Sequence, residues 1–202
     1  MTDYSVFLSE PPSMARPLSP EKREALLLSA MQAVAELGVM ASTSSIARRA
    51  GVADGTLFTY FSSKEVLFQE LYLHLKQSLV TAMMSDFPAQ ADYRQRMEYI
   101  FNRYVSWGLN NALERVVLAR LSASGQVTAD TRALGAQPFQ AVSRTMESGV
   151  EDGVLIDAPI SFISSVIESI ANTTIEHIEK SPEEADSHRQ LGFHMLWRAI
   201  TA

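Results

Sequence analysis

Cysteine is absent from this chain of 202 residues. Disulfide scaffolds, thiolate metal sites and cysteine nucleophiles are therefore excluded, and nothing in the composition requires an oxidising compartment. The N-terminus carries Asp3 and Glu10 where a signal peptide needs positive charge, and no apolar run approaches the ~20 residues of a membrane span. We therefore predict a cytoplasmic protein that does not insert into a membrane.

Motifs for catalysis and for cofactor binding are also missing. The four histidines have neither the i, i+4 spacing nor the flanking carboxylate of a helical zinc site. Ser122 and Ser124 lie near Gly125 but do not form the Gly-x-Ser-x-Gly turn of a nucleophile elbow, and there is no glycine-rich phosphate loop. The prediction is a protein that is not an enzyme, with no catalytic residue, no metal and no cofactor.

Basic charge is scarce, and it is unevenly distributed. The net charge of −6 argues against nucleic acid, yet residues 16–64 carry six basic and four acidic side chains, against 11 basic and 17 acidic in residues 65–202. A slightly basic segment joined to an acidic one is compatible with a DNA-binding head and a body that stays off the phosphates. Because the basic surplus is small, DNA affinity would require a dimer.

Strand alternation is not seen either, and the apolar residues, which belong to a 47% hydrophobic composition, recur at helical spacing. Residues 1–18 hold three prolines and no helical period, which predicts a flexible arm whose Arg16 could touch a phosphate. Ser19 and Pro20 then provide the cap and the first position of a helix that ends at Gly38.

The stretch from Ser42 to Lys64 predicts two short helices around a tight turn. Ser42 caps the first helix, and Gly51 reverses the chain where a Cβ would be strained. The second helix begins near Asp54 and turns Leu57 and Phe61 inward. Its outward residues are Asp54, Thr56, Phe58, Thr59 and Tyr60. Exposed aromatic and hydroxyl side chains fit the groove-binding helix of a helix-turn-helix, although spacing alone also fits other helical hairpins.

Several segments of this hairpin resemble the DNA-binding signature of the TetR family of repressors. They are Ile46-Ala47, Ala50-Gly51-Val52, Gly55-Thr56-Leu57-Phe58, Tyr60-Phe61 and Ser63-Lys64-Glu65. The resemblance covers Leu26 to Leu71. It implies an all-α protein with an N-terminal three-helix helix-turn-helix head, which we place at residues 19–63, and a C-terminal helical bundle for ligand binding and dimerisation at residues 64–202, the body.

The resemblance also implies which side chains meet DNA. Phosphate-contacting positions of the family are matched by Ser42, Thr56, Phe58 and Tyr60, although Phe58 lacks the usual hydroxyl. Positions near base edges are matched by Gly55 and Thr59. Thr43 could reach a phosphate or a base, and Lys64 combines an ammonium group with a helix N-terminus, where a phosphate is favoured.

Two residues depart from the family pattern at the start of the second short helix. Ala53 stands where a capping serine is frequent, and Asp54 stands where a lysine or arginine is common. Asp54 either caps the helix, which we favour, or accepts from cytosine N4 in a base contact. We include Asp54 among the predicted DNA-binding residues.

The next helix is predicted to connect head and body. Ser62 and Glu65 have capping-box spacing, with Phe61 and Val66 at the positions of a hydrophobic staple. The helix continues along one apolar stripe, which consists of Leu67, Leu71, Leu75 and Leu79. It would therefore touch the head at one end and the body at the other.

Every later segment also predicts helix, and these helices carry more aromatic and methionine surface than a plain bundle needs. The helix break expected at Pro138 would loosen one wall of a binding site between these helices. We therefore expect a small-molecule effector to bind among Phe101, Tyr104, Trp107, Phe139, Met146 and His177. A filled core is the alternative for each residue. The acidic surplus of the body mildly favours an apolar or cationic ligand.

The last two helices, beginning near Pro159 and Ser181, carry apolar residues on more than one face. One face suits the monomer core and another suits a partner, and in proteins similar to TetR these two helices make the dimer. The predicted interface residues are Phe162, Val166, Ile167, Ile170, Leu191 and Met195. A thicker single-chain core is the alternative.

The resemblance thus implies a transcriptional regulator, most often a repressor, that binds a palindromic operator in double-stranded DNA as a homodimer and is released by a small-molecule ligand. The alternative is a small-molecule-binding or protein-interaction helical module with weak or lost DNA binding. Asp54, Phe58 and the small basic surplus favour that alternative.

Overall fold

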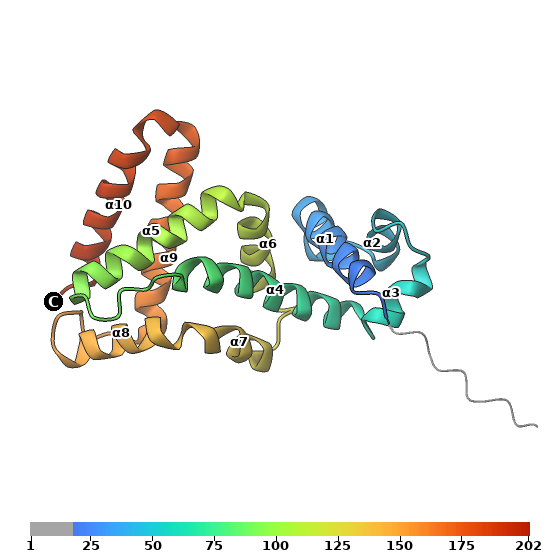
Figure 1. Ribbon diagram of the computed structural model, residues 1–202, viewed down its shortest axis with the longest axis horizontal. Coiled ribbons are helices and arrows are strands. Elements are labelled where there is room, and N and C mark those ends of the chain that lie inside the picture. The colour runs from blue at the N-terminus through green and yellow to red at the C-terminus, as the bar shows by residue number, and fades with distance from the viewer. Residues whose placement is uncertain (1–17) are drawn as a thin grey trace, which may run out of the picture.

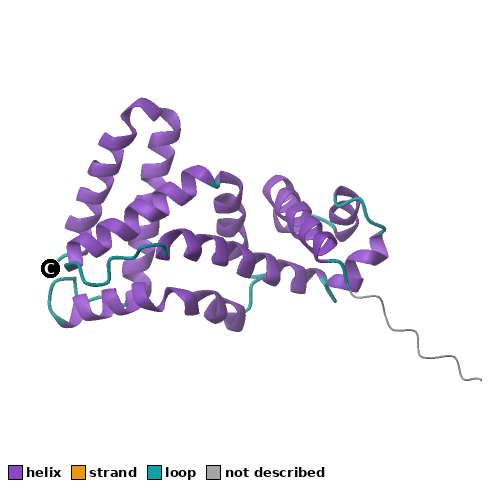
Figure 2. Ribbon diagram, viewed as in Figure 1, coloured by secondary structure: helices purple, strands orange, loops and turns teal. Residues whose placement is uncertain are grey.

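The structure is a computed structural model that describes residues 18–202; the predicted arm, including Arg16, lies outside the described residues except for Leu18. Across this described part, ten α-helices and three short 3₁₀ helices are joined by brief loops, and the only extended pairing is the single bridge between Leu155 and Thr201. The all-α prediction is therefore confirmed (Figure 2).

The head consists of α1 (Pro20–Leu37), α2 (Thr43–Arg49) and α3 (Asp54–Tyr60) and lies at one end of the elongated molecule (Figure 1). Its boundaries follow local rules. The side chains of Ser19 and Ser42 accept hydrogen bonds from the amides of Lys22 (3.3 Å) and Ser45 (3.2 Å), as predicted for helix caps. Gly51 has φ +69°, in the left-handed region that favours glycine, and forms the turn between α2 and α3.

The interior of the head is tightly closed. Its apolar side chains that are at most 2% exposed include Leu26, Leu27, Ile46, Leu57 and Phe61. Phe61 follows the last residue of α3 and is fully buried, so it anchors the end of that short helix against α1 and α2. Burying this side of α3 leaves its opposite side in solvent.

The connecting helix α4 (Lys64–Met84) begins one residue away from the predicted capping box. Ser63, not Ser62, is the cap, and its side chain accepts a hydrogen bond from the amide of Val66 (3.2 Å). The two adjacent serines are chemically equivalent caps, and it is Ser63 that has the extended cap conformation. Glu65 therefore occupies the second helical position, and the predicted Ser62–Glu65 box is wrong.

The body contains α4 and six further helices. They are α5 (Tyr93–Asn110), α6 (Ala112–Ala123), α7 (Ala129–Ala136), α8 (Gln140–Glu151), α9 (Ile160–Lys180) and α10 (Ala185–Ile200). Pro138 lies in the 3₁₀ turn η2 (Gln137–Phe139), where the helical path restarts, as its missing N–H predicts. The long helices α9 and α10 form a hairpin at the end of the molecule opposite the head (Figure 1).

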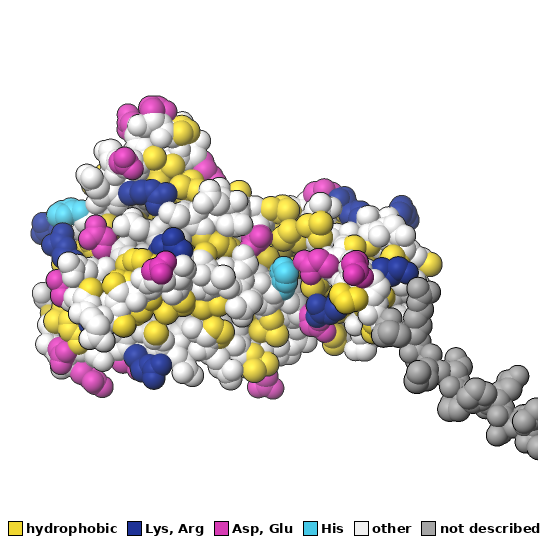
Figure 3. Space-filling model, viewed as in Figure 1, with side chains coloured by type: hydrophobic (Ala, Val, Ile, Leu, Met, Phe, Trp, Pro, Cys, Tyr) yellow, Lys and Arg dark blue, Asp and Glu magenta, His cyan; other side chains and the backbone are white. Residues whose placement is uncertain are grey.

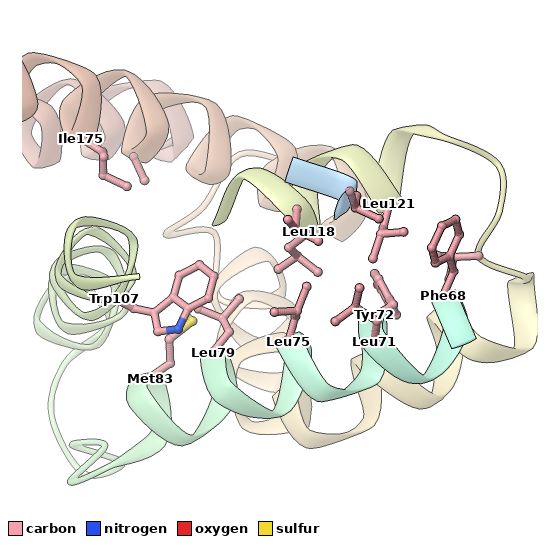
Figure 4. Close-up of a cluster of buried hydrophobic side chains, with 14 of the residues drawn as sticks. Phe68, Leu71, Tyr72, Leu75, Leu79, Met83, Trp107, Leu118, Leu121 and Ile175 are labelled. Carbon is pink, nitrogen blue, oxygen red and sulfur yellow. The ribbon is translucent and has the colours of Figure 1, made fainter. Parts of the chain in front are cut away.

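The apolar stripe of α4 is buried in the core, where other helices of the body pack against it. Leu67, Leu71, Leu75 and Leu79 are at most 4% exposed, which agrees with the predicted stripe. Figure 4 shows the row of side chains on α4 pointing toward Leu118 and Leu121 of α6 and toward Trp107 of α5. Within the described part of the chain, every helix is too short or too polar to span a bilayer.

Candidate DNA-binding and ligand-binding sites

The outward side of α3 is the first candidate site. It carries the exposed residues Asp54, Gly55, Phe58 and Thr59, with the half-buried Thr56 and Tyr60 beside them. Phe58 is 51% exposed although it is a large apolar side chain. Because the inward side of α3 is already buried in the head, this face is free to meet a partner.

Two hydroxyl groups on α3 have partners within the chain. The Tyr60 hydroxyl accepts a hydrogen bond from the backbone amide of Ser19 (3.1 Å), which ties the start of α1 to the end of α3. The hydroxyl proton of Tyr60 remains available for an external acceptor. Thr59 Oγ1 donates to the carbonyl of Gly55 one turn earlier, at 3.4 Å.

Asp54 does not cap α3. The cap position is Ala53, which has the extended conformation of a cap but no side-chain hydrogen bond, and Asp54 is the first helical residue. The favoured interpretation of Asp54 as the cap is therefore wrong, because the helix begins one residue earlier than a capping role requires. A carboxylate in the first turn is still stabilised by the helix dipole.

Ion pairs occupy part of the positive charge of the head. Arg49 donates to Glu36, with Nη1–Oε1 at 3.0 Å, and Arg23 pairs with Glu70 of α4. Arg49 is therefore paired within the head, and Arg23 is paired with the body across the junction of α1 and α4. Figure 3 accordingly shows positive and negative side chains interspersed on the visible face of the head.

Three further cations lie in or next to the head: Lys22, Arg48 and Lys64. None of them forms an ion pair with any residue of the described range 18–202. Lys64 occupies the first position of α4, shortly after the end of α3, and its ammonium lies 5.3 Å from the centroid of the Phe68 ring. It thus combines positive charge with the partial positive charge of a helix N-terminus. This combination favours a phosphate group.

The second candidate site is a cavity of about 430 Å³ inside the body, within the ~300–1,000 Å³ range of small-molecule sites. Its walls come from α4, α5, α6, α7, η2, α8 and α9. Of the six residues predicted to bind a ligand, three line this cavity: Tyr104, Phe139 and Met146. The interruption of the helical path at Pro138 places Phe139 in its wall.

The other three predicted residues lie elsewhere. Phe101 is fully buried and packs against Phe193 of α10, with ring centroids 5.9 Å apart. Trp107 is 3% exposed, and its indole donates to Ser78 Oγ (3.2 Å). His177 is exposed on α9, where its ring centroid lies 5.5 Å from that of His188, with the two rings tilted by 40°. The aromatic content of the helices therefore divides between cavity and core.

Three charged residues that sequence reasoning missed also line the cavity: Lys76, Arg132 and Glu168. The Lys76 ammonium lies 4.2 Å from the centroid of the Phe139 ring, and burial lowers its pKa, an effect that Glu168 partly opposes. A signal for Lys76 was present in the sequence. It shares one face of α4 with Tyr72, Leu79 and Met83, so a lysine interrupts an otherwise apolar row.

Polar groups at the cavity wall are partly connected. Arg132 Nη2 donates to the carbonyl of Ser122 (2.9 Å), and the Tyr104 hydroxyl lies 3.5 Å from Glu168 Oε1 and 3.4 Å from Asn172 Oδ1. Burial raises the pKa of Tyr104, so this phenol stays protonated at neutral pH. Residues 18–202 contain no group of three or more His, Asp or Glu side chains placed to hold a metal ion.

A second connection between cavity and head runs through α6. Leu118 and Ser122 line the cavity, and Arg120 between them donates to the carbonyls of Val34 (2.9 Å) and Ala35 (2.7 Å) in the last turn of α1. The amide of Gly38 also donates to the Val34 carbonyl, so the guanidinium is a second donor at this helix C-terminus, where carbonyls have few partners within the helix. The prediction named only α4 as the link and missed this contact.

The predicted dimer residues differ in exposure. Phe162, Leu191 and Met195 are 64%, 55% and 57% exposed, whereas Val166 and Ile170 are half-buried. Ile167 is 8% exposed and lines the cavity. Spacing of four residues places Phe162 near Val166 on α9, and Leu191 near Met195 on α10.

Comparison with known proteins gives sequence matches to part of the chain and structural matches to most of it. The sequence model for bacterial regulatory proteins of the tetR family matches residues 26–71, which include α2, α3 and parts of α1 and α4. The fatty acid metabolism regulator protein of Bacillus subtilis (strain 168) is 31% identical over 78 residues. That match spans 38% of this chain and 40% of the length of the Bacillus protein.

Solved structures resemble nearly the whole chain. A protein from Shewanella sp. PV-4 assigned to the tetR family of transcription regulators is similar with a TM-score of 0.81 and 27% identity, over 90% of this chain and 98% of that one. A TetR family transcription regulator from Marinobacter aquaeolei VT8 has a TM-score of 0.80 at 21% identity, over 90% of this chain and 96% of that one. The second likeness concerns the fold alone.

Proposed function

Since the chain belongs to the TetR family of bacterial regulatory proteins, and is thus a DNA-binding transcription regulator, we propose that it is a repressor that binds a palindromic operator as a homodimer and is released by a small-molecule effector. The observation that carries this proposal is α3, a short helix with a fully buried inner side and an exposed aromatic and hydroxyl face. We keep residues 19–63 as the head and 64–202 as the body, because α4 begins at Lys64.

In this proposal α3 lies in the major groove and α2 braces it. Gly55 and Thr59 face base edges, and Asp54 accepts from a cytosine N4. Phosphates or sugars on either side are contacted by Ser42, Thr43, Thr56, Phe58, Tyr60 and Lys64. The chain from Ser42 to Lys64 thus supplies both the reading and the positioning contacts.

Dimerisation would bury the exposed apolar side chains of α9 and α10, since large solvent-facing apolar groups at one end of the molecule indicate a partner surface. A two-fold dimer there would present two α3 helices to a palindromic site. Met195→Arg should then give monomers by light scattering, whereas the matched Met195→Leu should remain dimeric. A Met195→Arg protein that stays dimeric would remove α10 from the interface. Ile167 is unsuited to this test because it lines the cavity.

Effector release is supported by the position of the cavity. Its walls include α4, which continues into the head, and α6, whose Arg120 holds the last turn of α1. A ligand that shifts either helix would change the spacing of the two α3 helices. Couplings of about 1–3 kcal/mol, which change affinity ~5- to 150-fold, suffice for such control. The Bacillus relative is a regulator of fatty acid metabolism, so aliphatic compounds are the first effectors to examine.

The test of DNA binding uses the protein and labelled DNA from the region upstream of its own gene. We expect a discrete shifted complex whose affinity falls steeply with salt and survives an excess of unrelated DNA. Equal affinity for unrelated DNA would contradict an operator-specific repressor. No complex even at low salt would favour the alternative of a helical module that has lost DNA binding.

A further inference from the structure

The wall of the body cavity is mostly apolar, and it carries two cations, Lys76 and Arg132, of which Lys76 stands among the apolar side chains of α4. Apolar side chains reach it from six α-helices, α4 to α9, among them Leu79, Met83, Ile100, Val142, Met146 and Ile167. Lys76 stands on α4 within this apolar surface and is half-buried. A ligand that filled such a cavity would be largely aliphatic, with one polar group near Lys76.

Lys76 has no direct ion pair among the described residues, although the carboxylate of Glu168 partly opposes the lowering of its pKa. Within residues 18–202 no carboxylate comes within ion-pair distance of its ammonium, and its closest recorded interaction is with the face of the Phe139 ring. Removing a cation from water is unfavourable unless a partner replaces the lost hydration, and an aromatic face replaces it only in part. The lowered pKa of Lys76 has the same cause.

The stem of Lys76 is held in place by the close approach of α7. A Cβ added at Gly135 would lie 3.3 Å from Lys76 Cγ and 2.9 Å from the ring of Tyr72, so the backbone of α7 runs directly over both side chains. A confined stem leaves the ammonium little choice of position. The charge is therefore presented to the cavity at small entropic cost to a ligand.

The other charges at the wall do not neutralise Lys76. Glu168 is exposed, so water screens the charge of its carboxylate. Arg132 is a second cation, and its Nη2 already donates a hydrogen bond to the carbonyl of Ser122. Lys76, Arg132 and Glu168 together carry one net positive charge. This local balance is opposite to the acidic surplus of the whole body, from which an apolar or cationic ligand was expected.

We propose that the cavity binds an aliphatic monoanion whose acidic group pairs with Lys76 and whose chain fills the apolar part of the site. This inference rests on the proposed effector site and specifies its ligand class. Because Lys76 belongs to α4, whose first residue directly follows the head, an anion paired with its ammonium acts on the helix that joins body and head.

Three probes of equal chain length distinguish the charge of the ligand: dodecanoate, dodecan-1-ol and dodecylammonium. Calorimetric titration of the full chain, below the micellar concentration of each probe, should give about tenfold or greater preference for dodecanoate over the alcohol, since hydrogen bonds to charged groups exceed neutral ones. Lys76→Met should remove this preference, so that dodecanoate binds no more tightly than dodecan-1-ol. Lys76→Arg should retain it.

Lys180→Met is the matched control, because Lys180 is exposed at the end of α9 and does not line the cavity. Circular dichroism must show that each variant keeps its helical content. Equal affinity for the three probes, preference for dodecylammonium, no binding of any probe, or undiminished dodecanoate binding by Lys76→Met would each overturn the inference.

The experiment separates this inference from the proposed function. Binding is measured without DNA, so dodecanoate that binds through Lys76 but leaves operator affinity unchanged would support the ligand class and contradict effector release. Operator binding without any dodecanoate binding would overturn the ligand class and leave the DNA-binding regulator intact.

Discussion

The head and the body place their candidate functional side chains on opposite sides of their helices. In the head, Leu57 and Phe61 fill the interior, and the candidate DNA-binding residues of α3 lie on the surface. In the body, Tyr104, Phe139 and Lys76 point inward and line a cavity built by several helices. An outward site depends on one local segment, whereas an inward site depends on how distant segments pack.

The difference predicts different tolerance to mutation. Surface residues of α3 can change without loss of packing, so substitutions there should affect DNA binding more than stability. Body residues serve packing and ligand binding together, since the walls of the cavity are also parts of the core. The following variants test this contrast, from the largest expected effect to the smallest.

The largest effect is expected from Gly192→Ala in α10. A Cβ there would overlap Thr174 Oγ1 and lie 3.0 Å from Phe101 Cζ, both in well-packed surroundings of the body. Overpacking of this kind typically costs about 1–3 kcal/mol, and each kcal/mol lowers the Tm by roughly 2–4 °C in a protein of this size. Thermal unfolding followed by circular dichroism measures the shift.

Gly55→Ala is the matched control in the head, because a Cβ at Gly55 meets nothing within 4 Å. It should leave the Tm unchanged or raise it, since alanine in a helix is favoured over glycine by about 0.5–1 kcal/mol. The contrast between the two regions fails if Gly192→Ala unfolds at the same temperature as the parent protein, or if Gly55→Ala unfolds well below it.

A smaller effect is expected from Lys64→Ala at the start of α4. Loss of one phosphate contact should weaken binding to every DNA sequence about equally, by about tenfold at 0.1 M salt, and lower the slope of log K against log salt by about one. Fluorescence anisotropy with operator and unrelated DNA measures both quantities. Lys180→Ala in the body should change neither. A Lys64→Ala protein that loses its preference for the operator would assign this residue to base reading instead.

The smallest effect is expected from Thr59→Ala on the exposed face of α3. If Thr59 reads a base edge, the variant should change the preference at one position of each half-site by about 1 kcal/mol or more, without changing the salt slope. Binding to a set of singly substituted operators measures the change. Thr81→Ala on the exposed side of α4 is the control. An unaltered preference profile would exclude Thr59 from the reading residues.

Much of the head could be predicted because its determinants are local. Ser19, Ser42 and Gly51 act through hydrogen bonds or backbone angles that involve only neighbouring residues, and the structure confirms all three. Prediction failed where two local choices were nearly equal. Ser62 and Ser63 offer the same capping group, and Asp54 lies next to the residue that occupies the cap.

The sequence by itself determined the all-helical class and the outward face of α3, because both follow from the periodicity of apolar residues. It also determined that the helical path is interrupted at Pro138, because proline has no backbone N–H to donate. Only the tertiary structure decided which apolar body residues enclose a cavity. An apolar position on a helix meets either a packed neighbour, as Phe101 does, or a void, as Met146 does, and the sequence pattern is the same for both. Which of these occurs depends on the side chains that distant helices bring to the opposite wall, and so does the place of Lys76 beside Phe139.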